Sequence, residues 1–271
     1  MSSDSHARQP VLFVPHGAGP CFFMDWSPAD TWNGMGRFLK GVAATLPQPP
    51  KAILLVSAHW LGPQFSVTGH ARPELIYDYS GFPAHTYELT YPAPGHPQLA
   101  QRIAELLNAD GLPAQVDANR GFDHGMFIPL KMMFPAAEVP VVQLSLRQDL
   151  DPQAHLQAGR ALTALRDENV LIVGSGMSFH NMRGYGDSRF SAVSDEFDSW
   201  LTNAVQNPAP ERERLLRAWA QAPKARLCHP PGAEEHLVPL LVVAGAGDEA
   251  PGHRIYSERV MQTTLSAYRF G

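Results

Sequence analysis

The feature that most constrains the fold is a set of four short segments that are apolar throughout instead of alternating between apolar and polar residues. They are VLFV at 11–14, AILLVSA at 52–58, VPVVQLSL at 139–146 and VLIVGSG at 170–176. Strands of this kind suit a sheet that is covered on both faces, as in α/β proteins. The sequence therefore predicts an α/β fold, with a central mostly parallel or mixed sheet and helices on both of its faces.

Helical patterns lie between these strands, as an α/β fold requires. Four helices are expected, from Pro97 to before Gly111, from Asp151 and Pro152 to about Asn169, over 191–206, and over ERERLLRAWAQA at 211–222. The proline-rich patches between them are too short to be interdomain linkers. We therefore expect a polar tail at residues 1–10 and a single domain over 11–271.

Composition excludes several classes of partner. The 271 residues carry a net charge of −5, and no basic stripe provides a surface for nucleic acid. No apolar run approaches the roughly 18 residues of a membrane span, and the N-terminus has no apolar signal core. Cys21 and Cys228 have no metal-type spacing, so two free thiols in a reducing compartment are expected. These features predict a cytoplasmic protein without nucleic-acid or membrane partners.

Five of the 12 histidines stand out by their positions. His16, His59 and His180 lie at or just beyond the ends of apolar strands, and in open α/β sheets ligands bind at the carboxyl ends of the strands. His124 follows Asp123, which is placed to cap a short apolar helix, and His236 precedes another apolar segment. One such histidine is more often an ordinary loop residue, but the repeated pattern favours a metal site. Neutral imidazole suits iron, zinc, copper and nickel.

The remaining candidates for chemistry are weaker. Six other histidines are expected on the surface, at 70, 85, 96, 155, 229 and 253. Of these, His229 begins the HPPG turn near His236. The segment GSGMSF at 174–179 lacks the last glycine of a dinucleotide fingerprint and the lysine of a P-loop. His180 stands where the G-x-S-x-G elbow of a serine hydrolase needs glycine. A nucleotide site and a serine nucleophile are therefore not predicted.

Six segments, in this order, carry a resemblance to a known family: PHGAGP, SAHW, GFDHGMFIPLKMMFP, GSGMSFHNM, PPGAEEHLVPLLVVAGAG and LSAYRFG. Together they resemble the extradiol ring-cleaving dioxygenases of the protocatechuate 4,5-type (class III) superfamily, in particular the DOPA 4,5-dioxygenase-like branch. The resemblance runs from about Val11 to the C-terminus. It implies that residues 11–271 form one catalytic domain, with its active site at the carboxyl ends of the strands.

The resemblance also implies roles for the five histidines. His16 and His59 match the family's first two metal ligands, and His236 matches the position of the third. His124 matches the active-site acid/base histidine, and His180 matches a second active-site histidine close to the metal. In the protocatechuate enzymes the third ligand is a glutamate, so Glu235 remains an alternative to His236.

The implied reaction is an Fe(II)-dependent insertion of O2 into a catechol of the 3,4-dihydroxyphenyl type, which gives a ring-opened semialdehyde. A site of three histidines could also retain Zn(II) during purification. The implied partners are a small catechol and O2, and the chain is expected to be a monomer or a homodimer. One alternative is a zinc-dependent hydrolase that uses the same histidines and needs no oxygen. The other is a non-enzymatic binding member of the fold.

Overall fold

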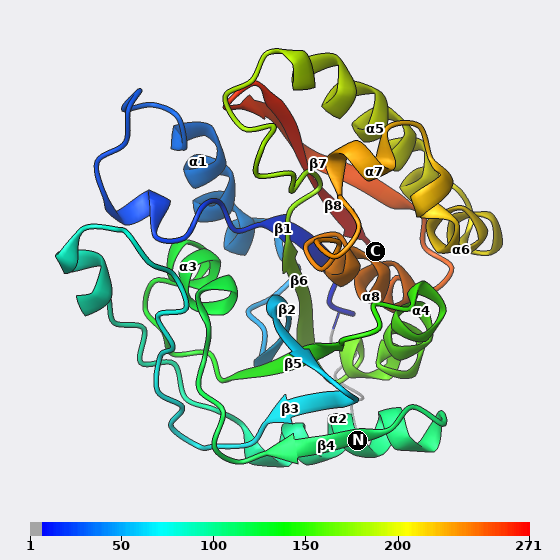
Figure 1. The fold of residues 1–271 in the computed structure, drawn as a ribbon. Coiled ribbons are helices and arrows are strands. Elements are labelled where there is room, and N and C mark those ends of the chain that lie inside the picture. Colours follow the sequence, from blue (N-terminus) through cyan, green and yellow to red (C-terminus); the bar gives the residue numbers. More distant parts are fainter. Residues whose placement is uncertain (1–6) are drawn as a thin grey trace.

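The computed structural model describes residues 7–271, so most of the tail expected at 1–10 lies outside it. Within this part the strands form one eight-stranded sheet in the order β4-β3-β5-β2-β6-β1-β8-β7 (Figure 1). The strands are β1 (Val11–Pro15), β2 (Ala52–Gly62), β3 (Phe65–Thr68), β4 (Ala114–Asp117), β5 (Val141–Arg147), β6 (Val170–Gly176), β7 (Gly252–Val260) and β8 (Thr263–Phe270). The four apolar segments of the sequence are its four central strands.

These central strands are parallel to one another, and antiparallel pairs flank them. Strand β6 lies between β1 and β2, so that Ile172 is level with Val11 on one side and Leu54 on the other. Strand β8 runs antiparallel to β1, and β3 runs antiparallel to β5. The expected mixed sheet is therefore confirmed.

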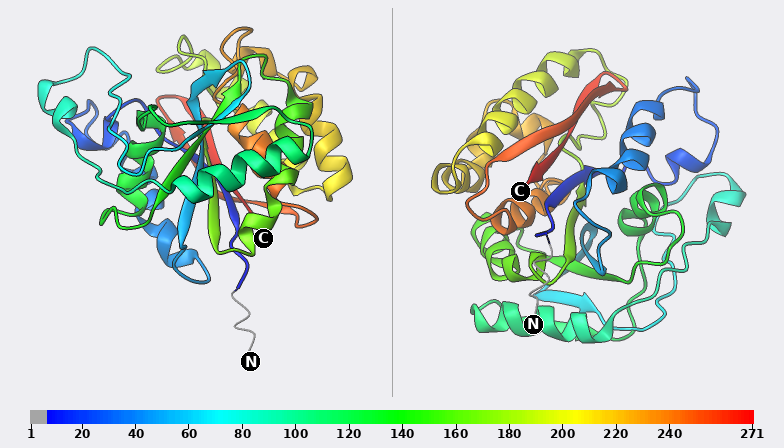
Figure 2. Two further views of the ribbon diagram at one scale, coloured as in Figure 1. Left: turned by 90° about the horizontal axis from the view of Figure 1, so that it is seen from below. Right: turned by 180° about the vertical axis from the view of Figure 1, so that it is seen from behind.

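Helices cover both faces of the sheet, which explains why the central strands carry no polar face. The helices are α1 (Asn33–Gly41), α2 (Pro97–Ala109), α3 (His124–Met133), α4 (Pro152–Ala161), α5 (Arg189–Gln206), α6 (Ala209–Arg217), α7 (Ala225–Cys228) and α8 (Val238–Ala246). Helices α1 and α3 lie on one side of the central strands, and α4 and α8 lie on the other (Figure 1). Helix α5 packs along the β7–β8 hairpin, and α2 packs on β3 and β4 (Figure 2).

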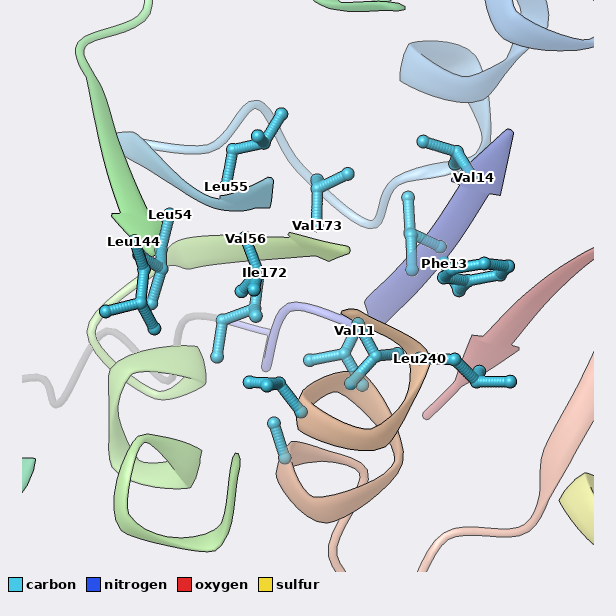
Figure 3. Close-up of a cluster of buried hydrophobic side chains, with 14 of the residues drawn as sticks. Val11, Phe13, Val14, Leu54, Leu55, Val56, Leu144, Ile172, Val173 and Leu240 are labelled. Atoms are coloured by element: carbon cyan, nitrogen blue, oxygen red, sulfur yellow. The ribbon is translucent and has the colours of Figure 1, made fainter. Parts of the chain in front are cut away.

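Helix α8 forms the centre of the second layer and has no polar side. All nine of its residues are buried, and it packs against β1, β2 and β6 beneath the core drawn in Figure 3. Gly159 of α4 and Gly245 of α8 meet the backbone of the other helix, where a Cβ atom would overlap a carbonyl oxygen. These two glycines let the helices approach closely.

Some local expectations differ from the structure. The helix expected to reach Asn169 ends at Ala161, followed by a 3₁₀ turn, Thr163–Arg166, before Asn169 adopts a left-handed conformation. His155 and His229, expected on the surface, are completely buried. Both rings form hydrogen bonds to the backbone in place of water. His155 donates to the Asp151 carbonyl at 2.7 Å, and His229 donates to the Ser178 carbonyl at 2.9 Å. Within residues 7–271 no helix combines the length and the apolar character needed to cross a membrane.

Candidate active site

The structure brings all five singled-out histidines together. His16 follows β1, His180 follows β6, His124 is the first residue of α3, and His236 lies just before α8. The ring centroids of His16 lie 4.9 Å from His59 and 5.1 Å from His236. The ring of His124 is 3.9 Å from that of His59, and His180 stacks on His236 at 3.3 Å. Residues from both ends of the chain therefore share one site.

His59 reaches the site in a way that the sequence did not indicate. Strand β2 continues to Gly62, so His59 lies within the strand and not at its end. The pairing of β2 with β5 is irregular between Val56 and Leu61, which includes His59. An irregular stretch of this kind re-aims side chains that a regular ladder would hold.

His16, His59 and His236 form a group that could hold a metal ion. One ring nitrogen from each lies within 4.8 Å of the other two, and the Nε2 atoms of His16 and His59 are 3.2 Å apart. Burial lowers the pKa of His59 to about 3 and holds the pKa values of His16 and His236 well below 6.5. The rings are therefore neutral at ordinary pH, which is the form in which imidazole binds a metal.

Oxygen atoms near the Nδ1 atoms orient the rings of these three histidines. The Ser175 hydroxyl donates to the Gly125 carbonyl, so its oxygen is left to accept from Nδ1 of His16, 3.0 Å away. This arrangement places the ring proton of His16 on Nδ1 and leaves Nε2 free to coordinate. Nδ1 of His236 lies 2.7 Å from a carboxylate oxygen of Glu235, and Nδ1 of His59 lies 3.7 Å from Asp78. Each Nδ1 atom thus faces an oxygen atom, which leaves the three Nε2 atoms as the candidate ligand atoms.

Two other groups of residues have metal-ligand spacing and overlap the first. They are His59, Asp78 and His124, and His180, Glu235 and His236. In both, the carboxylate faces the Nδ1 edge of a histidine and so acts as a hydrogen-bond partner of the ring. The donor set of three neutral imidazoles fits Fe(II) or Zn(II).

His124 is held by Asp78, which sequence reasoning missed. One carboxylate oxygen of Asp78 accepts from Nδ1 of His124 at 2.8 Å and from its backbone N–H at 2.9 Å. Burial acts to raise the pKa of Asp78, but the hydrogen bond and charge of His124 outweigh it, so the pKa is lowered. Asp78 lies in the long connection between β3 and α2, which passes beside α3 (Figure 1). No motif in the sequence links it to His124.

Asp123 precedes α3 as expected, but its side chain does not cap the helix. The carboxylate instead accepts hydrogen bonds from the Ser57 hydroxyl at 2.7 Å and from the Gln143 amide. Burial raises the pKa of Asp123, because the side chain is removed from water. The acceptor at the first helical N–H comes from Asp78, so the cap is supplied by a distant part of the chain.

His180 stacks on His236, and among the described residues its ring lacks a hydrogen bond at one buried nitrogen. Burial lowers its pKa to about 4, and its Nδ1 atom is buried without a hydrogen-bond partner in residues 7–271. The backbone N–H of His180 donates to the Cys228 carbonyl at 3.0 Å, and buried His229 binds the neighbouring Ser178 carbonyl. His180 is thus a fixed, neutral ring at the edge of the three-histidine group.

The five histidines open into a cavity of about 400 Å³. A volume of this size holds one small aromatic molecule. The rest of its lining is mainly aromatic and sulfur-containing: Trp26, Trp32, Tyr79, Phe82, Tyr185, Met177, Met182 and Met261. The site therefore combines a neutral metal-binding group, a histidine paired with a carboxylate, and flat apolar walls.

Comparison with known proteins identifies the family. The family model described as the catalytic LigB subunit of aromatic ring-opening dioxygenase matches residues 10–271. The chain is 39% identical to Dioxygenase tasH of Hapsidospora irregularis, over 97% of this chain and 85% of that protein. It is 38% identical to the 4,5-DOPA dioxygenase extradiol of Beta vulgaris, with 92% and 90% covered, and 37% identical to that of Escherichia coli, with 97% and 94% covered.

A solved structure agrees with these sequence matches. The crystal structure of the uncharacterized Escherichia coli K12 protein JW3007 superposes with a TM-score of 0.77 at 31% identity, covering 97% of this chain and all of that one. The family match spans the whole sheet and every histidine of the cavity. The chain therefore belongs to the LigB family of aromatic ring-opening dioxygenases and is an extradiol ring-cleaving enzyme.

Proposed function

We propose that residues 11–271 form one catalytic domain that uses Fe(II) and O2 to open the ring of a 3,4-dihydroxyphenyl-type catechol, giving a semialdehyde. His16, His59 and His236 hold the iron in this proposal. The observation that carries it is the convergence of three neutral imidazoles beside a fourth, His124, that a carboxylate orients. That arrangement provides a metal site and a separate proton acceptor within one cavity.

His236 is proposed as the third ligand in preference to Glu235. The Glu235 carboxylate lies 2.7 Å from Nδ1 of His236, so it is already engaged on the side of the ring away from Nε2. A carboxylate in that position fixes the ring and raises its basicity. With a glutamate ligand, His236 would lose its partner and its orientation.

When bound, the iron would supply open positions for the catechol oxygens and O2 and a path for electrons from the catechol to O2. His124 accepts the proton of a catechol hydroxyl, because Asp78 occupies its Nδ1 and stabilises the imidazolium that forms. His180 holds the substrate from the opposite side of the histidine group, beside His236. The aromatic walls hold the ring of the substrate flat and exclude water.

Oxygen uptake tests the proposal directly. Protein loaded anaerobically with Fe(II) should consume O2 when mixed with a catechol and form a yellow ring-opened product. Zinc-loaded protein should consume none, whereas the hydrolase alternative requires activity with zinc in the absence of O2. If no member of a panel of catechols supports oxygen uptake, the dioxygenase function proposed here is wrong.

We also propose that the protein works in the cytoplasm. Cys21 and Cys228 are both buried as free thiols, which suits a reducing compartment. Burial raises the pKa of Cys228 to about 12, so its thiol stays protonated and unreactive. Fractionation of cells that express the tagged chain would test this.

A further inference from the structure

The walls of the cavity carry no ionic group. Among residues 7–271, no Lys, Arg, Asp or Glu side chain lines the cavity that contains the five histidines. Asp78 and Glu235 lie behind histidine rings and bond to their Nδ1 edges. These two carboxylates therefore lie behind the histidines and outside the lining of the cavity.

Two phenol hydroxyls in the walls are occupied, whereas the indole Nε1 of Trp32 has no hydrogen-bond partner among the described residues. The Tyr79 hydroxyl donates to the Thr86 carbonyl at 2.6 Å, and the Tyr185 hydroxyl donates to the Phe179 carbonyl at 2.8 Å. These two phenols present their rings to the cavity and their hydroxyl protons to the backbone. They are not free to donate to a carboxylate on the substrate.

Three basic side chains, Arg37, Lys40 and Arg259, line other cavities. Arg37 and Lys40 line a second cavity that shares only Trp26 and Trp32 with the first, so the two indoles stand between these cations and the histidines. Arg259 lines another cavity that shares only Met261 with the first. A substrate carboxylate in the histidine cavity would meet indole and thioether groups in place of a cation.

The mouth of the cavity has the same apolar character. Met182 lines the cavity with 68% of its surface exposed to solvent. Methionine is flexible and polarizable, and it adapts to apolar groups of different shapes. An apolar side chain held in water at the edge of an apolar cavity suits contact with an apolar part of a ligand.

We propose that this enzyme selects catechols whose side chain is uncharged and apolar, and that it discriminates against catechols that carry a carboxylate. The inference rests on the proposed function and names its substrate class. A side-chain carboxylate that enters the cavity gives up its hydration and finds no cationic side chain in the lining. An ester or alkyl group of the same size gains contact with the indoles and methionines.

A matched pair of substrates tests the inference. The probes are 3-(3,4-dihydroxyphenyl)propionate and its methyl ester, which share the catechol and the chain length and differ in charge. We expect kcat/KM for the ester to exceed that for the acid by at least tenfold. An acid that is turned over as efficiently as the ester would overturn the inference and leave the dioxygenase function intact.

Binding provides a measurement that does not depend on turnover. Anaerobic calorimetric titration of both probes into the protein should give a Kd at least tenfold lower for the ester. If no catechol of the panel supports oxygen uptake, the proposed function fails, and the ratio of the two Kd values still decides the preference of the cavity. Equal Kd values would overturn it.

A variant pair tests whether the missing cation is the cause. Met182→Lys places an ammonium group at the mouth, and at low ionic strength it should raise the acid-to-ester ratio of kcat/KM and of affinity several-fold. Met182→Gln has a polar but neutral side chain and should leave that ratio where it is in the unmodified enzyme. An unchanged ratio in the lysine variant, or an equal rise in both variants, contradicts the role given to the uncharged lining.

Discussion

The carboxylate of Asp78 accepts two hydrogen bonds from His124, one from ring Nδ1 at 2.8 Å and one from the backbone N–H at 2.9 Å. It thereby fixes both the ring and the start of α3, whose first residue is His124. The other carboxylate oxygen lies 3.7 Å from Nδ1 of His59. Asp78 therefore connects the proposed proton acceptor with a proposed metal ligand.

Replacing Asp78 with asparagine should separate positioning from metal binding. Asp78→Asn keeps an acceptor for His124 but removes the charge that stabilises its protonated form, so kcat should fall by about 10- to 100-fold. Iron content should stay near that of the unmodified enzyme. Asp110→Asn, at an exposed position after α2, is the matched control and should change neither value. An Asp78 variant with full kcat contradicts the assigned role.

His124→Phe should retain iron and lose turnover. The ring of phenylalanine fills the same space but cannot accept a proton, and the loss of a general base typically costs about 100- to 10,000-fold in rate. Oxygen uptake and metal analysis on the same sample check both parts. If this variant no longer binds iron, His124 is a ligand and the assignment is wrong.

Metal retention should distinguish His236 from Glu235. His236→Ala, like His16→Ala and His59→Ala, should abolish iron retention, because each removes one of three ligands. Glu235→Gln should keep iron with an affinity reduced by about 10- to 100-fold, as expected of a partner that only orients a ligand. The reverse ranking, with iron lost from the Glu235 variant and kept by the His236 variant, would make Glu235 the third ligand.

The hydroxyl of Ser175 should matter for the metal more than for folding. Ser175→Ala removes the acceptor at Nδ1 of His16, so we expect iron affinity to fall by about tenfold or more. Ser145→Ala is a suitable control, because Ser145 is equally buried on β5 and its hydroxyl accepts from the Ser66 backbone N–H. Titration with iron should find weaker binding in the first variant alone.

Buried His155 should make the fold sensitive to acid. Burial lowers its pKa in the folded protein from 6.5 to about 4. Since the unfolded chain takes up the proton first, the stabilising contribution is complete above pH 6.5 and is lost as the pH falls from 6.5 toward 4. At pH 5 this loss amounts to about 2 kcal/mol.

The variant His155→Gln keeps a donor and an acceptor but does not titrate. Between pH 7 and pH 5, the free energy of unfolding of the unmodified protein should fall by about 2 kcal/mol more than that of the variant. Denaturant unfolding at the two pH values measures the difference, and any constant cost of the substitution cancels. Parallel losses in both proteins would mean that His155 is not the group responsible.

Local sequence patterns were enough to predict the central sheet and the five histidines of the site. Continuous apolar character is a local property, and it is required wherever a strand is covered on both faces, so the strand predicted at 170–176 has its observed bounds. His16 and His180 could be placed at the carboxyl edge because strand direction fixes which end of a parallel strand faces the site. The end predicted for the helix that starts at Pro152 was wrong, because α4 ends at Ala161 and the chain continues as a 3₁₀ turn.

The contacts of each side chain could be seen only in the folded chain. Asp78 reaches His124 across 46 residues of sequence, and His229 is buried against Ser178 across 51. The cavity walls come from loops far apart in the chain, so their lack of charge has no sequence signature. Local patterns record which residues must be buried and which strands run parallel, whereas contacts between distant loops depend on how the whole chain packs around the sheet.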